Sequence, residues 1–450
     1  MGGITSVRIY FIGNKRSDRC VAAFAFDFTP LEDRTVPAAG DLDATFGSGG
    51  VAGVTFDLPG AQNDLAYAVA IKPNGGVVLA GEVQNGNESS FGVVVLKPDG
   101  TLDTGFSGDG RALVTFGLMS GGQEVATSVA VQSDGKILVA GNVQILSTFT
   151  NPAYDMGIAR FNVDGTLDTT FGTGGKLTVA FPDSEPPPGL ENPIDSDDRV
   201  NAIVVQPDGK IVLAGKATTF DIPTYYDTLT AFAAVRLNTD GSLDGSFGNG
   251  GKVYIPFGHT NVNSEGVNAV ALQADGRIVL GGLMLIWNDT PSPDGQIRTQ
   301  NYYAAARLNP NGQLDTTFDG DGSKAFVFTH GSSMAAGARA MAVQQDEKIL
   351  LAGSDFITTA SIVRLNPDGS FDPAFDGDGK KTMSIGDGSA GDPTGLLVQP
   401  DGKVVIVGSL TTEAFATGKG TLNRLNPDGS RDSTFGVNGY PGFAGRIFVG

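Results

Sequence analysis

The chain has 450 residues, of which 40% are hydrophobic, so it can bury a large core. Its formal net charge of −19 opposes binding to a nucleic-acid backbone, because such binding requires clustered Lys and Arg. The single cysteine, Cys20, excludes an intrachain disulfide, and no apolar run approaches the ~18 residues of a membrane span.

Residues 1–40 are expected to be a leader or targeting-like segment that precedes the folded domain. A basic patch at residues 15–19 comes before the short apolar run CVAAFAF, and small residues follow at 37–39. These features favour an extracytoplasmic protein, either secreted or on the cell surface. The runs VRIYFIGN from Val7 and VAAFAF from Val21 also have the pattern of two degenerate strands.

One signature, Leu-Asp-x-x-Phe-x-x-x-Gly, recurs along the rest of the chain, with Leu replaced in the last two copies. Its copies begin at Leu42, Leu102, Leu167, Leu243, Leu314, Phe371 and Arg431. Successive copies are separated by 57 to 76 residues. A motif that recurs at such spacings indicates a repeat array. We therefore expect residues 41–450 to form a single repeat domain.

Each repeat contains four short segments with the pattern of β-strands, called a, b, c and d in chain order. Strand a follows the last glycine of the signature and alternates with period two, as in Leu177, Val179 and Phe181. Strands b and c flank a Pro-Asp-Gly turn or a close relative, as in IVVQPDGKIVLAG from Ile203. Strand d leads into a second Asp-Gly or Asn-Gly turn, as in YAAARLNPNG to Gly312.

Four strands per repeat without any helical periodicity are the plan of a β-propeller blade. The sequence therefore predicts an all-β fold, a β-propeller of six four-stranded blades. The seventh signature is followed by one more strand, RIFVG from Arg446. This surplus strand leaves an alternative of seven blades, the last built from both termini. From chain order we expect strand a to lie nearest to the propeller axis.

The motifs DGKIVLAG and RLNPDGSLDxxFG resemble those of the bacterial delta-60 repeat family. The resemblance extends over about residues 41–440. It implies a propeller fold and a bacterial surface or secreted setting. It implies no catalytic residue.

The signature loops carry aspartates that either bind calcium or only form turns. The two DGDG copies contain Asp319, Asp321, Asp376 and Asp378. Other copies have Gly, Ser or Asn at these positions, which is typical of a turn in the left-handed conformation. Because calcium takes about six to eight oxygen ligands, we expect turns and no cofactor, with calcium as the alternative.

An arginine on strand d and the aspartate of the next signature recur together in five repeats, for example as Arg236 and Asp244. A pair that is repeated around a ring indicates an inter-blade bridge or a backbone anchor. We therefore interpret these charges as structural.

Antiparallel strands alternate in direction, so the a-to-b and c-to-d loops lie on one face of the disc. These loops vary between repeats, and function concentrates on variable loops held by a rigid frame. We expect this variable face to bind a glycan, a peptide or a surface protein. Its candidate ligand-binding aromatics are Phe149, Tyr154, Phe220, Tyr225, Tyr226 and Trp287. The alternative role for these aromatics is to pack the loops onto the disc.

Four polar residues occupy one position, eight residues after the signature glycine, in four consecutive repeats. They are Asp183, His259, His330 and Asp387. With strand a innermost, they would ring the channel mouth and could hold a transition metal or act as an acid–base pair. They define the alternative function, an extracellular hydrolase or lyase that acts on a polymer.

The leading hypothesis is a non-catalytic binding propeller that is monomeric. The sequence has no Ser-His-Asp order, no phosphate-cradling glycine loop and no HExxH helix.

Overall fold

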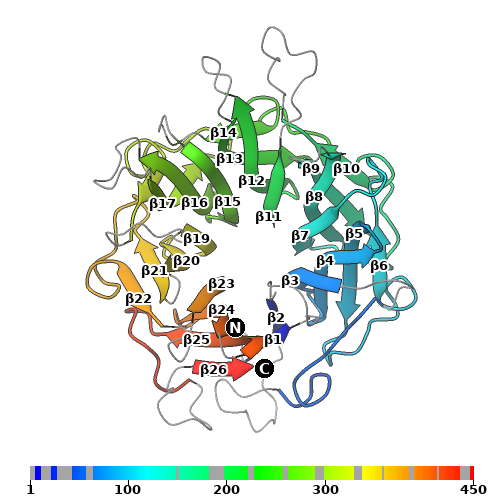
Figure 1. Ribbon diagram of the computed structural model, residues 1–450, viewed down its shortest axis with the longest axis horizontal. Helices are drawn as coiled ribbons and strands as arrows, with labels where there is room; N and C mark the ends of the chain where they lie inside the picture. The colour runs from blue at the N-terminus through cyan, green and yellow to red at the C-terminus, as the bar shows by residue number, and fades with distance from the viewer. Residues whose placement is uncertain are drawn as a thin grey trace.

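The computed structural model is an all-β ring of sheets around a central axis (Figure 1). The structure describes residues 6–11, 22–27, 43–56, 64–147, 152–181, 197–220, 228–255, 257, 262–288, 298–328, 337–356, 359–384, 390–412, 415–435 and 446–449. Six sheets have four strands each, and all strand pairs within them are antiparallel. The six-bladed propeller predicted from the sequence is therefore confirmed.

The first three blades are consecutive in the chain. Blade 1 contains β3 (Asp64–Ile71), β4 (Val77–Asn85), β5 (Glu88–Leu96) and β6 (Arg111–Val114). Blade 2 contains β7 (Glu124–Val131), β8 (Ile137–Ser147), β9 (Pro152–Phe161) and β10 (Lys176–Val179). Blade 3 contains β11 (Arg199–Val205), β12 (Ile211–Phe220), β13 (Thr228–Leu237) and β14 (Lys252–Ile255).

The other three blades follow in chain order around the axis. Blade 4 contains β15 (Val262–Leu272), β16 (Ile278–Asn288), β17 (Arg298–Leu308) and β18 (Ser323–Phe326). Blade 5 contains β19 (Gly337–Val343), β20 (Ile349–Phe356), β21 (Thr359–Leu365) and β22 (Lys380–Met383). Blade 6 contains β23 (Ala390–Val398), β24 (Val404–Thr412), β25 (Phe415–Leu425) and β26 (Arg446–Val449).

The radial order of the strands differs from the expected one. Each blade runs b, c, d and then the a strand of the following signature, so strand b is innermost and strand a is outermost. The expectation that strand a lies nearest to the axis is wrong. In the signature loop the chain folds back on strand d, since Asp244 N donates to the Arg236 carbonyl and Arg236 N to the Gly251 carbonyl, both at 2.9 Å. Strand a therefore pairs with strand d of the same sheet, and the a-to-b connection leads from the outer edge of one blade to the inner strand of the next.

The hydrophobic cores lie between neighbouring blades. Between blades 1 and 2, Val93 and Ala112 of blade 1 pack in one cluster with Ile137 and Val139 of blade 2. The signature phenylalanine is buried in every copy. These residues are Phe46, Phe106, Phe171, Phe247, Phe318, Phe375 and Phe435. Recurrence of the signature thus supplies one large apolar side chain to each of the five junctions from blade 1 to blade 6.

The outermost strands are short and charged. Strands β6, β10, β14, β18, β22 and β26 have four residues each. In blade 2, Lys176 donates from Nζ to the Thr115 carbonyl, 2.6 Å away at the outer edge of blade 1. Short edges that carry cationic side chains oppose pairing with another sheet.

The two termini do not build a seventh blade together. Strand β26 pairs with β25 and completes blade 6. Strands β1 (Ser6–Phe11) and β2 (Ala22–Asp27), both within residues 1–40, pair with each other, and β2 lies against β3 (Figure 1). The alternative in which one last blade combines both termini is therefore wrong.

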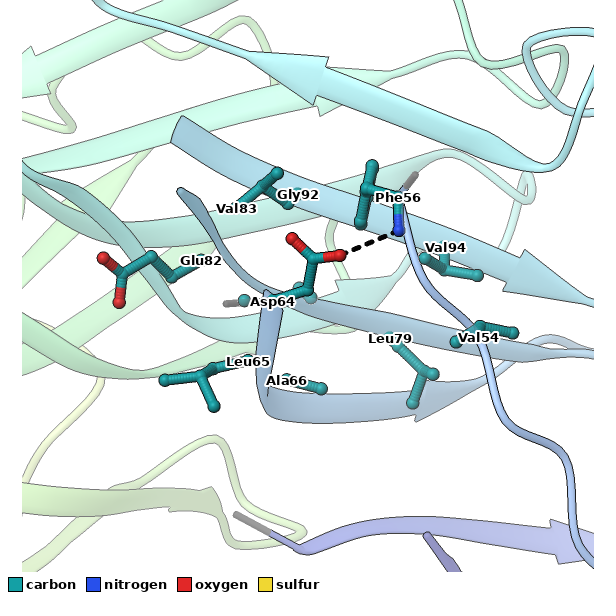
Figure 2. A pocket seen from close by; sticks show the side chains of 12 residues that line it. Val54, Phe56, Asp64, Leu65, Ala66, Leu79, Glu82, Val83, Gly92 and Val94 are labelled. Atoms are coloured by element: carbon teal, nitrogen blue, oxygen red, sulfur yellow. Dashed lines mark hydrogen bonds between the residues drawn. The ribbon is translucent and has the colours of Figure 1, made fainter. Parts of the chain in front are cut away.

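Residues 43–56 take the place of an outer signature loop next to blade 1. Gly47 N donates to the Asp99 carbonyl at 2.7 Å, which is the bond that the next five signatures make to the following blade. Phe56 N donates to Asp64 Oδ2 at 2.9 Å, as Figure 2 shows. A mostly apolar cavity of about 20 Å³ lies there and is too small for any ligand larger than water.

Candidate functional site

The recurring arginine and aspartate form a buried ion pair in blades 2 to 6. In blade 3, Arg236 Nε donates to Asp244 Oδ2 at 2.7 Å, and Lys210 Nζ lies 2.9 Å from the same oxygen. Burial raises the pKa of the Asp244 carboxyl. The hydrogen bonds from Lys210 and Ser246 and the charge of Arg236 outweigh burial, so this pKa lies well below its usual range. The equivalent pairs are Arg160–Asp168, Arg307–Asp315, Arg364–Asp372 and Arg424–Asp432.

The same guanidinium also reaches the next blade. Arg236 donates from Nη1 to the Pro310 carbonyl in the d-to-a turn of blade 4 and lies over the Phe247 ring at 4.5 Å. Gly248 N donates to the adjacent Asn311 carbonyl at 2.8 Å. The corresponding arginine acceptors elsewhere are the carbonyls of Thr239, Pro367 and Pro427. The structural interpretation of these charges, as backbone anchors between blades, is confirmed.

The candidate calcium loops have the geometry of turns. Asp319 and Asp376 each have a φ of 50°. Asp319 pairs with Lys324 at 2.7 Å, and the equivalent Asp376 pairs with Lys381 at 2.8 Å. The other two carboxylates, Asp321 and Asp378, each accept a backbone N–H two residues further on. Among the described residues, no three His, Cys, Asp or Glu side chains gather where they could hold a metal ion.

The residues Asp183, His259, His330 and Asp387 lie outside the described residues. They belong to connections that leave an outermost strand, such as the segment between β14 and β15. Because strand a is outermost, the argument that placed them at the channel mouth no longer holds. Their grouping stays a prediction.

Of the six candidate aromatics, the structure describes the environment of Tyr154. This residue is half-buried near the start of β9, on the variable face of blade 2. Phe220 and Trp287 lie at the ends of β12 and β16, where the structure describes the backbone. The other three, Phe149, Tyr225 and Tyr226, lie outside the described residues.

Tyr154 belongs to a charged group at the seam between blades 2 and 3. The Arg199 guanidinium lies 4.2 Å from the centre of the Tyr154 ring. Asp197 accepts from Arg199 Nε at 2.8 Å and, through its other oxygen, from Lys216 Nζ at 2.8 Å. Burial raises the pKa of Tyr154, although the charge of Arg199 lowers it, so the phenol stays protonated at neutral pH. We call Tyr154, Asp197, Arg199 and Lys216 the seam cluster.

The backbone beneath the seam cluster is fixed. Asp198 is fully buried, and its Oδ2 accepts from Phe181 N at 2.6 Å. Asp198 N donates to the Tyr154 carbonyl at 2.7 Å, and Thr218 Oγ1 donates to the Asp197 carbonyl at 3.0 Å. These bonds hold the first residues of β11 against β9 and β12. The charged side chains above them, between about a quarter and a third exposed, therefore start from a fixed frame.

A second feature lies on the axis, where every innermost strand carries a β-bulge at the same position. The bulged residues are Tyr67, Thr127, Asn201, Asn268, Arg339 and Thr394. All six are polar, and a bulge turns a side chain away from the regular alternation of the strand. They encircle a channel cavity of about 490 Å³ that all six b strands line.

Sequence reasoning missed both features. The bulged residue stands five positions before the residue that follows each b strand, which is Gln in five blades and Lys72 in blade 1. A polar residue at that fixed distance was a usable signal for the channel ring. The charges of the seam cluster belong to no sequence motif, because Asp197 lies at the end of a long connection and Arg199 is the first residue of β11. Only folding brings them beside Tyr154 and Lys216.

Six segments of the chain match the family described as domain of unknown function (DUF5122) beta-propeller. The matched residues are 72–106, 132–171, 206–247, 293–318, 344–375 and 399–435. Matches to this family model therefore recur along the chain, and most of them run from the b-to-c turn to the signature phenylalanine. No match was found among curated proteins.

Solved structures with a similar fold are remote in sequence. The α-L-arabinanase of Penicillium chrysogenum in complex with arabinobiose is 12% identical, over 80% of this chain and 92% of that chain, with a TM-score of 0.45. The polysaccharide lyase Uly1 is 10% identical, over 80% and 77%, with a TM-score of 0.43. The PQQ-bound aldose sugar dehydrogenase of Streptomyces coelicolor is 12% identical, over 86% and 94%, with a TM-score of 0.39. At these TM-scores the likenesses support no conclusion about activity.

Proposed function

We propose that this protein is a non-catalytic binding propeller that holds a glycan on its variable face, at the seam cluster between blades 2 and 3. One observation carries the proposal. The arginine and aspartate that recur in blades 2 to 6 form buried ion pairs, and in blades 2 to 5 the arginine also anchors the next blade, whereas the seam cluster occurs once. At the position of Arg199 the other blades have Leu65, Val125, Gly266, Gly337 and Asp392, none of which is a cation. Architecture recurs in a repeat protein, and a feature that does not recur is the better candidate for a site.

The chemistry of the seam cluster suits sugar hydroxyls. Each hydroxyl both donates and accepts hydrogen bonds. Asp197 offers an acceptor that contacts the donors of both Arg199 and Lys216, each at 2.8 Å. Tyr154 adds a ring and a protonated phenol, and aromatic rings pack against the apolar faces of sugars. The bonds beneath the cluster reduce the entropy lost on binding.

The test is a glycan array probed with the full chain, followed by calorimetric titration of each glycan that binds. Tyr154→Ala and Arg199→Gln should each weaken binding about tenfold or more, because each removes a contact that is worth about 1.5 kcal/mol or more in a partly buried site. Val163→Ala is the matched control, because Val163 is 51% exposed on the opposite face. Equal melting temperatures show that the variants fold.

Unchanged affinity in both variants would place the ligand elsewhere and refute the site. An array without glycan hits, together with binding to a peptide library that Arg199→Gln abolishes, would keep the site and refute the glycan. Cleavage of a bound polymer would instead favour the hydrolase or lyase alternative. In that case Asp183→Asn, His259→Ala, His330→Ala and Asp387→Asn should each reduce turnover while leaving binding intact.

The setting of this function is part of the proposal. We infer from the repeat motifs that the chain is of the bacterial delta-60 type and acts outside the cytoplasm, secreted or at the cell surface. The described residues include no helix that is long and apolar enough to cross a membrane. Cell fractionation with an antibody against the protein tests the location. Recovery in the cytoplasmic fraction alone would refute it.

A further inference from the structure

We propose a second ligand site, in the central channel, that binds a small molecule carrying a carboxylate. The cavity on the axis has a volume of about 490 Å³, within the range of small-molecule sites. It is separate from the seam cluster, none of whose four residues lines it. The proposal therefore stands or falls independently of glycan binding on the variable face.

The wall of the cavity is built from the bulged positions. Five of the six bulged residues line it: Tyr67, Asn201, Asn268, Arg339 and Thr394. Regular alternation along the b strand would place an apolar side chain at this part of the wall. The bulge instead places a polar side chain from each blade there. Ser128, next to the bulge of blade 2, adds a hydroxyl. Every polar side chain of this wall can donate a hydrogen bond.

Half of the ring is held rigid by bonds between neighbouring blades. Thr127 Oγ1 donates to the Val200 carbonyl at 2.6 Å. Asn201 Nδ2 donates to the Val267 carbonyl at 2.8 Å, and Asn268 Nδ2 donates to the Ala338 carbonyl at 2.8 Å. The last of these bonds fixes the peptide next to Arg339. The cavity is therefore preformed, and a ligand loses less free energy in ordering it.

Arg339 determines the chemical class of the ligand. It is the one charged residue among the described residues that line the cavity, and its side chain is exposed. A guanidinium has five N–H donors in a planar fork, so it can bind a carboxylate in two parallel bonds in addition to contacts within the protein. Thr394 on the neighbouring blade 6 supplies a hydroxyl beside it. Donors on the wall and a cation at one side fit a hydroxylated carboxylate.

The experiment is isothermal titration of the full chain with acetate, succinate, citrate and D-glucuronate, with D-glucose as the uncharged counterpart of glucuronate. At least one carboxylate should bind, and if it is glucuronate, glucose should bind at least tenfold more weakly. Arg339→Gln should weaken carboxylate binding about ten- to a hundredfold, because a hydrogen bond to a charged group is lost. The carboxylate affinity of Arg339→Lys should lie between those of wild type and Arg339→Gln, since an ammonium keeps the charge but cannot form the bidentate pair.

Arg199→Gln is the matched control, because it removes an arginine of the seam cluster and should leave carboxylate binding unchanged. Thr394→Val provides a second channel variant, with a several-fold loss expected, in case Arg339→Gln fails to fold. No binding by any of the four carboxylates would overturn the proposal. So would equal affinity in wild type and Arg339→Gln, or complete competition by inorganic phosphate at the same concentration, which would indicate an unspecific anion effect.

Discussion

The glycine of each d-to-a turn should be irreplaceable, because the preceding blade lies against it. Gly241 has a φ of +88°, and a Cβ built there would lie 2.9 Å from Gly172 N and 3.0 Å from Cε2 of Phe171. Both atoms belong to blade 2, and Phe171 is fully buried. Gly320 offers a matched control, since its φ is +89° and a Cβ there would meet no atom within 4 Å.

The two substitutions separate backbone strain from contact between blades. In Gly320→Ala the left-handed conformation costs about 1 to 2 kcal/mol, and the lower entropy of the unfolded chain offsets about 0.4 to 1 kcal/mol of that. Gly241→Ala has the same terms and two more. It forces Phe171 or the backbone to move, which costs about 1 to 3 kcal/mol in a packed core. It also weakens the bond from Gly172 N to the Asp240 carbonyl, worth about 0.5 to 1.5 kcal/mol.

We therefore expect Gly241→Ala to be about 2 to 4 kcal/mol less stable than Gly320→Ala. Urea unfolding followed by near-ultraviolet circular dichroism measures this difference, with equal slopes required for the comparison. Equal midpoints for the two variants would refute the reasoning, because the close approach of blade 2 would then contribute nothing. If Gly241→Ala does not fold in buffer, the urea unfolding of both variants is measured in sucrose, which stabilises the folded state.

Two further predictions concern the anchors. Arg236→Met should lower the free energy of unfolding in urea by about 3 to 5 kcal/mol, because it breaks a buried pair and removes the bond to the Pro310 carbonyl. Lys381→Met removes a more exposed pair with Asp376 and should cost at most about 1 kcal/mol. Similar losses in the two variants would contradict the anchor role. The folded-state pKa values of Asp168, Asp244 and Asp432 are lowered, so their contribution to stability is complete above the unfolded value of about 4 and is lost as the pH falls toward the folded pKa. The melting temperature should accordingly drop between about pH 4 and pH 2, and the drop should be smaller in the less stable Asp244→Asn variant.

Much of the fold could be predicted because each blade repeats the same local rules. Turn residues such as Pro207, Asp208 and Gly209 locate the hairpins, and alternation in segments such as 177–181 locates the outer strands. The radial order was wrong because chain order does not define which strands share a sheet. Connection length is no guide either, since the 14-residue loop from Asn238 to Gly251 joins neighbours in one sheet and the six-residue segment 256–261 joins different blades.

The candidate sites were harder to predict, because they depend on residues that only the closed ring brings together. Tyr154 and Arg199 are 45 positions apart and meet across a blade junction. The channel ring collects one residue from each of six strands; their fixed distance from the following Gln or Lys marks the position, but only the assembled sheets show that Arg339 and Thr394 line the same cavity. Periodicity predicts which face of a strand is buried. It does not predict what lies opposite that face once the propeller has closed.

Blade 1 shows that the anchors recur for a physical reason rather than by copying alone. Here Val95 stands at the position of the anchoring arginine and Gly76 at that of the lysine. Lys72, at the position where the other blades have Gln, instead directs its Nζ toward Asp103 at 3.5 Å. A buried signature carboxylate needs a cation beside it. Blade 1 lacks both the arginine and the lysine of the other blades, and Lys72 takes their place.

The replacement is incomplete, and its limits fit the same argument. The Asp103 side chain is 24% exposed, against 4 to 8% for its counterparts in the other blades, so it needs less compensation. Without the arginine, blade 1 has no guanidinium bond to the turn of blade 2 and keeps the backbone bond from Ser107 N to the Asp164 carbonyl at 2.7 Å. The cost of burying an unpaired carboxylate thus explains why a cation recurs beside the signature aspartate, even where a different residue supplies it. Arg199 and Arg339 neutralise no signature carboxylate, and ligands should therefore be sought beside them.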